Sequence, residues 1–238
     1  MHLTHILKTA TAVAAVLSLA GCLGSSSGPS VPTTAPSGGP TGGTTGGSTT
    51  GGGTTGGTTK STQAAFDAKA LSYNAGLVPT SRPISGAATY KGEISMLTLA
   101  NPSDQTEALI GNLDMGVNFG SGVANPVTAT AGNFAGKVNG QATTVKGTLS
   151  TANALANDAN SVTATTTPAG TITGLAATLR GTISDPSGAL SGDARMILGG
   201  NFKETGGAKL AGGHQTTITP KGGGASIASG GSFYADKN

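Results

Sequence analysis

Residues 109–119 read Leu-Ile-Gly-Asn-Leu-Asp-Met-Gly-Val-Asn-Phe, and their alternation is the clearest structural signal in the chain. Every second position from Leu109 to Phe119 is apolar or glycine, and most of the intervening positions are polar. A period of two is that of a β-strand with one buried face. Because Gly120-Ser121-Gly122 follows, we predict that this strand ends in a turn.

The same alternation recurs before and after this strand. It predicts further strands over residues 86–99, 127–131, 142–149, 161–166, 175–183, 190–202, 210–219 and 227–235. Asp185-Pro186-Ser187-Gly188 is typical of a turn, so residues 175–202 are expected to form a hairpin. Eight or nine antiparallel strands in consecutive order favour an up-and-down barrel, because closure removes exposed strand edges. We therefore predict an all-β fold, an eight-stranded antiparallel β-barrel whose lumen is filled by side chains.

The polar face of the predicted strands carries charge. Its charged residues are Lys91, Glu93, Asp114, Arg180, Asp193 and Arg195. A lipid-facing barrel wall is apolar, and an Arg or Lys at mid-depth costs about 2 to 4 kcal/mol. We therefore expect this barrel to be soluble.

A helical pattern precedes the barrel. Phe66, Ala70 and Tyr73 stand at i, i+4 and i+7, and Ser61 or Thr62 is the expected N-cap. We expect residues 61–83 to contain a short helix that acts as a flap or plug against the barrel, which occupies residues 84–238.

The N-terminal residues combine an apolar run with the only cysteine of the chain. The run over residues 11–20 carries no charge and is shorter than the roughly 20 residues of a transmembrane helix. Leu19-Ala20-Gly21-Cys22 resembles the lipobox of bacterial lipoproteins, in which the chain is cut before an acylated cysteine. We expect residues 1–21 to be a signal peptide and Cys22 to be lipidated; the alternative is an ordinary secretory signal with a stray thiol. Leu23, where an aspartate favours the inner membrane, points to the outer membrane.

Residues 22–60 are almost entirely Gly, Ser, Thr and Pro. Such a segment cannot bury enough apolar surface to offset the entropy of ordering, so we expect a disordered tether. A Gly-rich coil of this length spans roughly 30 to 35 Å. The tether would hold the folded domain away from the membrane.

Composition excludes several functions. The formal net charge is only +3, and no run of Lys and Arg appears, so nucleic acid is not an expected partner. After removal of the signal peptide one histidine remains, His214, and the cysteine is expected to carry lipid. No metal cluster or catalytic triad can be assembled from these residues, so we expect neither an enzyme nor a resident cofactor.

Four short motifs carry a family resemblance. They are Tyr90-Lys91-Gly92, Gly200-Asn201-Phe202, the segment Ala208-Lys209-Leu210-Ala211-Gly212-Gly213, and Gly231-Ser232-Phe233-Tyr234-Ala235. With them the chain resembles the β-barrel domains of transferrin-binding-protein-B-like and factor-H-binding surface lipoproteins of Gram-negative bacteria. The resemblance implies a cell-surface protein that captures a host protein, haem or another metal-bearing solute. A nearby TonB-dependent receptor or surface-lipoprotein export barrel would be its expected partner.

Binding is expected at the loops, because the apolar strand faces are needed for the core. The candidate loops are 100–108, 120–126, 152–160, 185–188 and 203–209. Asp104, Glu107, Lys203 and Glu204 are the candidate contacts for a protein partner. We expect His214 to be a structural or solvent-facing histidine; the alternative is a ligand contact, and for haem it would be the natural axial ligand. A structural or adhesive envelope lipoprotein without a solute ligand is the other hypothesis for the whole chain.

Overall fold

The structure is a computed structural model that describes residues 60–75, 84–97, 108–138 and 140–238. These residues do not include the predicted signal peptide or Cys22. Of the predicted tether they include only Lys60. The described part contains one α-helix, nine strands and two short 3-10 helices. The elements are α1 (Gln63–Ala75), β1 (Ala87–Leu97), β2 (Ala108–Asn118), β3 (Val127–Val138), β4 (Gln141–Ser150), η1 (Thr151–Asn153), β5 (Asn160–Thr167), β6 (Gly170–Ile183), β7 (Gly192–Lys203), η2 (Thr205–Gly207), β8 (Lys209–Pro220) and β9 (Ile227–Lys237).

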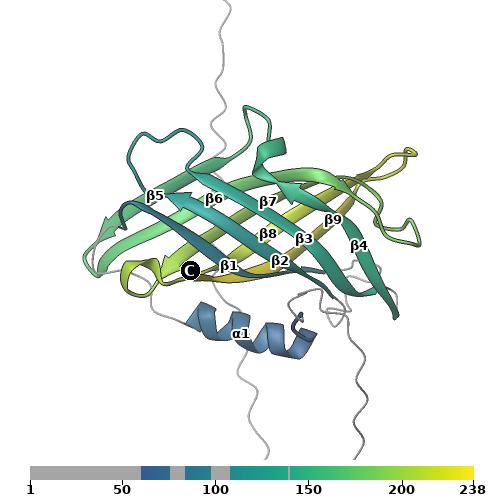
Figure 1. The fold of residues 1–238 in the computed structure, drawn as a ribbon, viewed down its shortest axis with the longest axis horizontal. Coiled ribbons are helices and arrows are strands. Elements are labelled where there is room, and N and C mark those ends of the chain that lie inside the picture. Colours follow the sequence, from purple (N-terminus) through teal and green to yellow (C-terminus); the bar gives the residue numbers. More distant parts are fainter. Residues whose placement is uncertain (1–59, 76–83, 98–107, 139) are drawn as a thin grey trace, which may run out of the picture. The chain divides into compact units, whose positions relative to one another are not determined.

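The strands form one antiparallel sheet that closes on itself (Figure 1). Their order is β4-β3-β2-β1-β9-β8-β7-β6-β5, and an additional pairing joins β4 to β6. Eight strands therefore form the closed barrel, and β5 is a ninth strand that pairs with β6. The predicted eight-stranded barrel is confirmed, with β5 as the departure from simple consecutive order.

Side chains fill the lumen. Tyr90, Leu113, Phe134, Leu179 and Phe233 are each at most 1% exposed and belong to one continuous core. They come from strands all around the barrel, and Tyr90, Leu113 and Leu179 occupy the faces that the alternation assigned to the inside. Eight strands enclose just enough space for such a core.

β3 is longer than the predicted strand over residues 127–131. Asn133 has a φ of 54°, and the pairing of β3 with β2 shifts register at this point. The inward positions are therefore Ala131 and then Phe134, so the period of two is broken. This bulge lets the strand continue to Val138.

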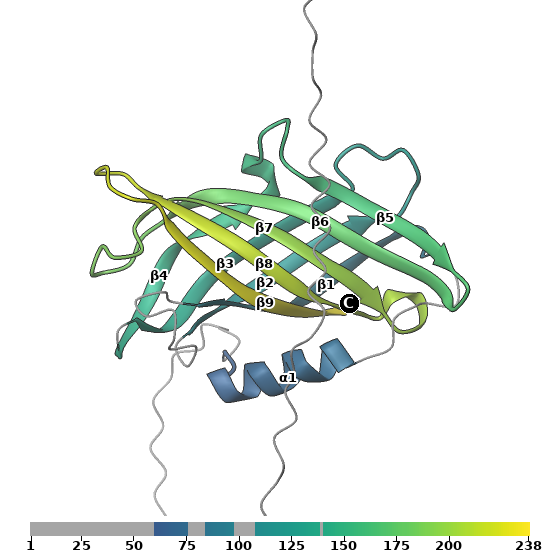
Figure 2. The ribbon, with the colours of Figure 1, turned by 180° about the vertical axis from the view of Figure 1, so that it is seen from behind.

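Helix α1 packs on the outer wall of the barrel (Figures 1 and 2). Phe66, Ala70 and Tyr73 form a second apolar cluster with Ile110, Ala211 and Tyr234. The predicted apolar stripe is confirmed, and the helix covers the wall and does not plug the lumen.

Polar contacts fix α1 in place. Just before α1, the N–H of Ser61 donates to Glu93 Oε1 at 3.0 Å. Within α1, the hydroxyl of Tyr73 donates to Asp236 on β9. Glu93 also accepts from the hydroxyl of Tyr234, which positions its carboxylate. None of the helices in the described ranges is long and apolar enough to cross a membrane.

Candidate functional site

The barrel wall is incomplete at the end where β5 lies. β4 and β5 share one edge of β6: β4 pairs near Arg180, and β5 pairs with the earlier part from Gly170 to Ala177. The side chain of Asn160 bridges the first residue of β5 to β3, with bonds of 2.9 and 2.8 Å to the N–H and C=O of Val127. After Asn160, β5 pairs with β6 and with no second strand in the part of the chain that the structure describes.

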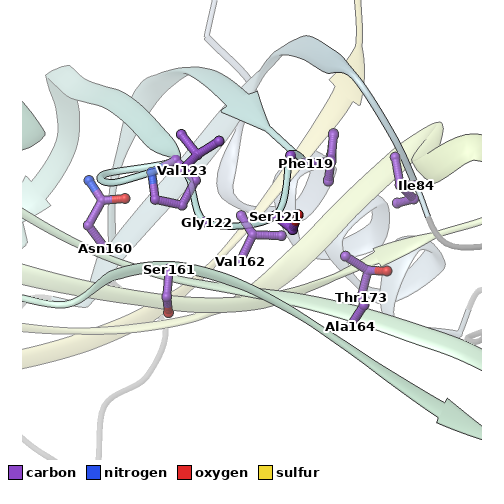
Figure 3. A pocket seen from close by; sticks show the side chains of 12 residues that line it. Ile84, Phe119, Ser121, Gly122, Val123, Asn160, Ser161, Val162, Ala164 and Thr173 are labelled. Atoms are coloured by element: carbon purple, nitrogen blue, oxygen red, sulfur yellow. The ribbon is translucent and has the colours of Figure 1, made fainter.

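A pocket of about 290 Å³ lies between β5 and the turn that joins β2 to β3 (Figure 3). We call it the mouth pocket and define it by Ile84, Phe119, Val123, Val162 and Thr173, which line it. Val123 is 37% exposed at its rim, and Phe119 packs edge-on against the core residue Phe202, with ring centroids 5.0 Å apart. The pocket therefore borders the hydrophobic core at this end of the barrel.

Thr173 is the unusual side chain of this pocket. It lies on the inner face of β6, is 2% exposed, and its hydroxyl has no hydrogen-bond partner among the residues that the structure describes. A buried hydroxyl without a partner is unfavourable by about 1 to 3 kcal/mol. A ligand group that reached the Thr173 hydroxyl would supply the missing partner.

None of the described residues that line the mouth pocket is charged. The loop between η1 and β5 carries Asp158, whose carboxylate is bound by two guanidinium groups. Arg180 binds it through Nε at 2.5 Å and a second nitrogen at 3.0 Å, and Arg195 lies at 3.3 Å. The bonds from Arg180 hold the pKa of Asp158 well below its usual range.

This ion cluster has a structural role. Arg180 and Arg195 are directly opposite one another on β6 and β7, where two like charges repel. The Asp158 carboxylate offsets part of this repulsion and holds its loop on the outer wall. These charges are therefore satisfied within the chain.

Lys203 is not a free rim residue. It is 6% exposed, and its ammonium donates to the carbonyl oxygens of Tyr73 at 2.7 Å and Asn74 at 2.9 Å. These are carbonyls of the last turn of α1, where a cation also meets the negative end of the helix dipole. Burial lowers the pKa of Lys203.

Glu204 is exposed and pairs with Lys209 at 2.6 Å. Its backbone has a φ of 61° where the chain leaves β7. Of the two residues predicted on this loop, Glu204 alone remains accessible. Asp104 and Glu107 lie outside the described residues.

His214 points inward, as the parity of β8 predicts, and is buried. Its Nε2 donates to the carbonyl oxygen of Ser95 at 2.5 Å, so Nδ1 accepts from the hydroxyl of Thr216 at 3.0 Å. Burial lowers the pKa of the imidazole. Both ring nitrogens are therefore engaged, which is the structural role that the sequence analysis favoured together with a solvent-facing position.

Sequence reasoning found the parts of the mouth pocket but not the pocket. It predicted the loop 120–126 and the strand 161–166, which lie about 40 residues apart in the chain. The contact between Asn160 and Val127 that brings them together leaves no local pattern.

No metal site is formed by His, Cys, Asp and Glu side chains within the described ranges. No protein-family model matches this chain, and no curated protein matches its sequence. The resemblance to surface lipoproteins therefore rests on the four sequence motifs given above.

Proposed function

We propose that this chain is a lipid-anchored outer-membrane protein, displayed at the cell surface, whose barrel captures a host protein or a solute at the end that holds the mouth pocket. The Leu19-Ala20-Gly21-Cys22 motif supports the anchor. The observation that carries the binding role is the mouth pocket itself, where an exposed apolar rim residue and an unpartnered hydroxyl stand beside an unpaired strand edge.

Haem is a less favoured ligand than a protein partner. The two nitrogens of His214 are already bonded to Ser95 and Thr216, so iron ligation by either nitrogen would require breaking the hydrogen bond that this nitrogen makes. A protein partner would find Val123, Glu204 and the outer edge of β5 accessible at the same end of the barrel.

Capture can be tested on cells that display the full chain. Ala164→Trp places a large side chain in the mouth pocket, because Ala164 is exposed and lines it. Thr165→Trp is the matched control, since Thr165 is an exposed neighbour on β5 that faces the other side of the strand. Cells are incubated with serum or with haemin, washed, and the retained material is measured.

The proposal predicts that Ala164→Trp loses capture and that Thr165→Trp keeps it. Equal retention by all three proteins would show that the mouth pocket is not the binding site. No retention by the wild type would favour the structural or adhesive envelope lipoprotein instead.

The anchor is tested by metabolic labelling with a clickable fatty acid. Wild-type protein should take up the label and sediment with outer membranes, and Cys22→Ala should do neither. Equal labelling of Cys22→Ala would refute lipidation at this residue.

A further inference from the structure

We propose that the mouth pocket binds a small, uncharged, mainly apolar molecule that carries one hydroxyl or carbonyl group, and that this group bonds to Thr173. The inference names the ligand class of the site and rests on the proposed binding function.

Size is the first argument. Pockets for drug-sized ligands have volumes of about 300 to 1,000 Å³, and the mouth pocket, at about 290 Å³, lies just below this range. The ligand is therefore smaller than a typical drug, on the scale of one or two fused rings or a short branched chain.

Polarity is the second argument. Ile84, Phe119, Val123 and Val162 give the pocket apolar walls beside the polar residues Ser121, Asn160 and Ser161. None of the described residues that line it is charged. An ionised ligand would lose its hydration without gaining a counter-charge, which is strongly unfavourable. An uncharged ligand with apolar surface avoids that cost and gains from burial.

The third argument is the buried, unpaired hydroxyl of Thr173. Both polar atoms of the Asn160 side chain are bonded to Val127, so this amide is occupied in holding β5 to β3. The Thr173 hydroxyl is buried and has no hydrogen-bond partner in the described part of the chain. A hydroxyl both donates and accepts, so a ligand hydroxyl or carbonyl oxygen suits it equally.

Chemically matched probes separate these contributions. Naphthalene offers apolar surface alone, 1-naphthol adds one hydroxyl, and 1-naphthoate adds a negative charge at pH 7. They are titrated by fluorescence into the full chain carrying Cys22→Ser, which has no acyl anchor. The variants are Thr173→Val and Thr178→Val.

Thr178 provides a matched control. It lies on the same strand, is fully buried and also has an unpartnered hydroxyl, but it does not line the mouth pocket. Thr→Val at either position keeps the side-chain shape and removes the hydroxyl. The two variants therefore differ in which side of β6 loses its hydroxyl.

We expect saturable binding of 1-naphthol with one site per chain, about 3- to 10-fold tighter than naphthalene, the range that one hydrogen bond supplies. 1-Naphthoate should bind more weakly than both. Thr173→Val should erase the advantage of 1-naphthol and keep the affinity for naphthalene, which also shows that its pocket is intact. Thr178→Val should behave like the wild type.

An unchanged ratio of 1-naphthol to naphthalene affinity in Thr173→Val would overturn the proposal, as would the absence of saturable 1-naphthol binding or tightest binding of 1-naphthoate. The cell assay keeps the two claims apart. Capture that depends on Ala164 without 1-naphthol binding would overturn the ligand class alone, whereas 1-naphthol binding without any capture by cells would overturn the display and capture role alone.

Discussion

Nε2 of His214 lies 2.5 Å from the carbonyl oxygen of Ser95, at the place where the pairing between β1 and β9 stops. The ladder between these strands ends at Ile94 and Phe233. Beyond this point, side chains replace the backbone hydrogen bonds. His214 donates to the carbonyl oxygen of Ser95, and the hydroxyl of Ser229 donates to the carbonyl oxygen of Leu97 at 2.6 Å. A neutral imidazole is thus part of the seam that joins the first strand of the barrel to the last.

This seam predicts a dependence of stability on pH. Burial lowers the pKa of His214 below 6.5 in the folded state, so the unfolded chain binds the proton more readily as pH falls through that value. The free energy of unfolding should therefore decrease between pH 7.5 and 5.5. Urea denaturation across this range is the measurement.

His214→Gln is the control for that prediction. The chain has two other histidines, His2 and His5, and both lie in the predicted signal peptide. The variant should therefore lose the pH dependence between 7.5 and 5.5. A wild-type stability that is constant or rises as the solution is acidified over this interval would contradict the structural role of the neutral imidazole.

Lys203 should hold the C-terminal end of α1 on the barrel. Lys203→Met keeps a long apolar stem but removes the ammonium that bonds to Tyr73 and Asn74. We expect the free energy of unfolding to fall by about 1 to 2 kcal/mol and the amides of α1 to exchange hydrogen faster. Lys146→Met, at an exposed position on β4, is the control and should leave exchange in α1 unchanged. Identical exchange in both variants would exclude the anchoring role.

The unpartnered hydroxyls predict stabilising substitutions. Thr173→Val and Thr178→Val each remove a buried group without a partner, so each should raise the free energy of unfolding by about 1 kcal/mol. Thr216→Val is the contrast, because the Thr216 hydroxyl bonds to His214 and its loss should destabilise by a similar amount. If all three substitutions changed stability in the same direction, the assignment of hydrogen bonds at these positions would be wrong.

Gly92 marks a place where two strands approach closely. A Cβ on Gly92 would lie 1.9 Å from the carbonyl oxygen of Tyr234, a backbone atom that cannot move aside. Gly92→Ala should therefore destabilise by about 2 to 3 kcal/mol. Gly199→Ala meets nothing within 4 Å and should change stability by no more than about 0.5 kcal/mol. Equal midpoints of urea unfolding for the two variants would contradict the close approach.

The barrel was predictable because its strands obey a local rule. Leu109, Leu113 and Met115 stand at alternating positions and all reach the core. The rule failed where the backbone departed from it: Asn133 shifts the inward positions by one, so the alternation could not show that Phe134 belongs to the core.

The site was less predictable because its residues meet through non-local contacts. The parity of β8 placed His214 inside, but nothing near it in the sequence indicates that Ser95 occupies its Nε2. Lys203 was expected to face solvent. Its side chain does lie on the outer face of β7, but α1 covers that part of the wall. Strand parity assigns a side chain to a face and does not say what covers the face.

The location of the bound ligand tests the central claim most directly. Methyl NMR of the full chain carrying Cys22→Ser can follow Ile, Val and Thr methyl groups during a titration with 1-naphthol. The account predicts that the largest shift changes occur at Ile84, Val123, Val162 and Thr173, with Ile110 beneath α1 unaffected. Changes centred on Ile110 or on lumen residues such as Val145, with none at Val162 and Thr173, would contradict binding at the mouth pocket.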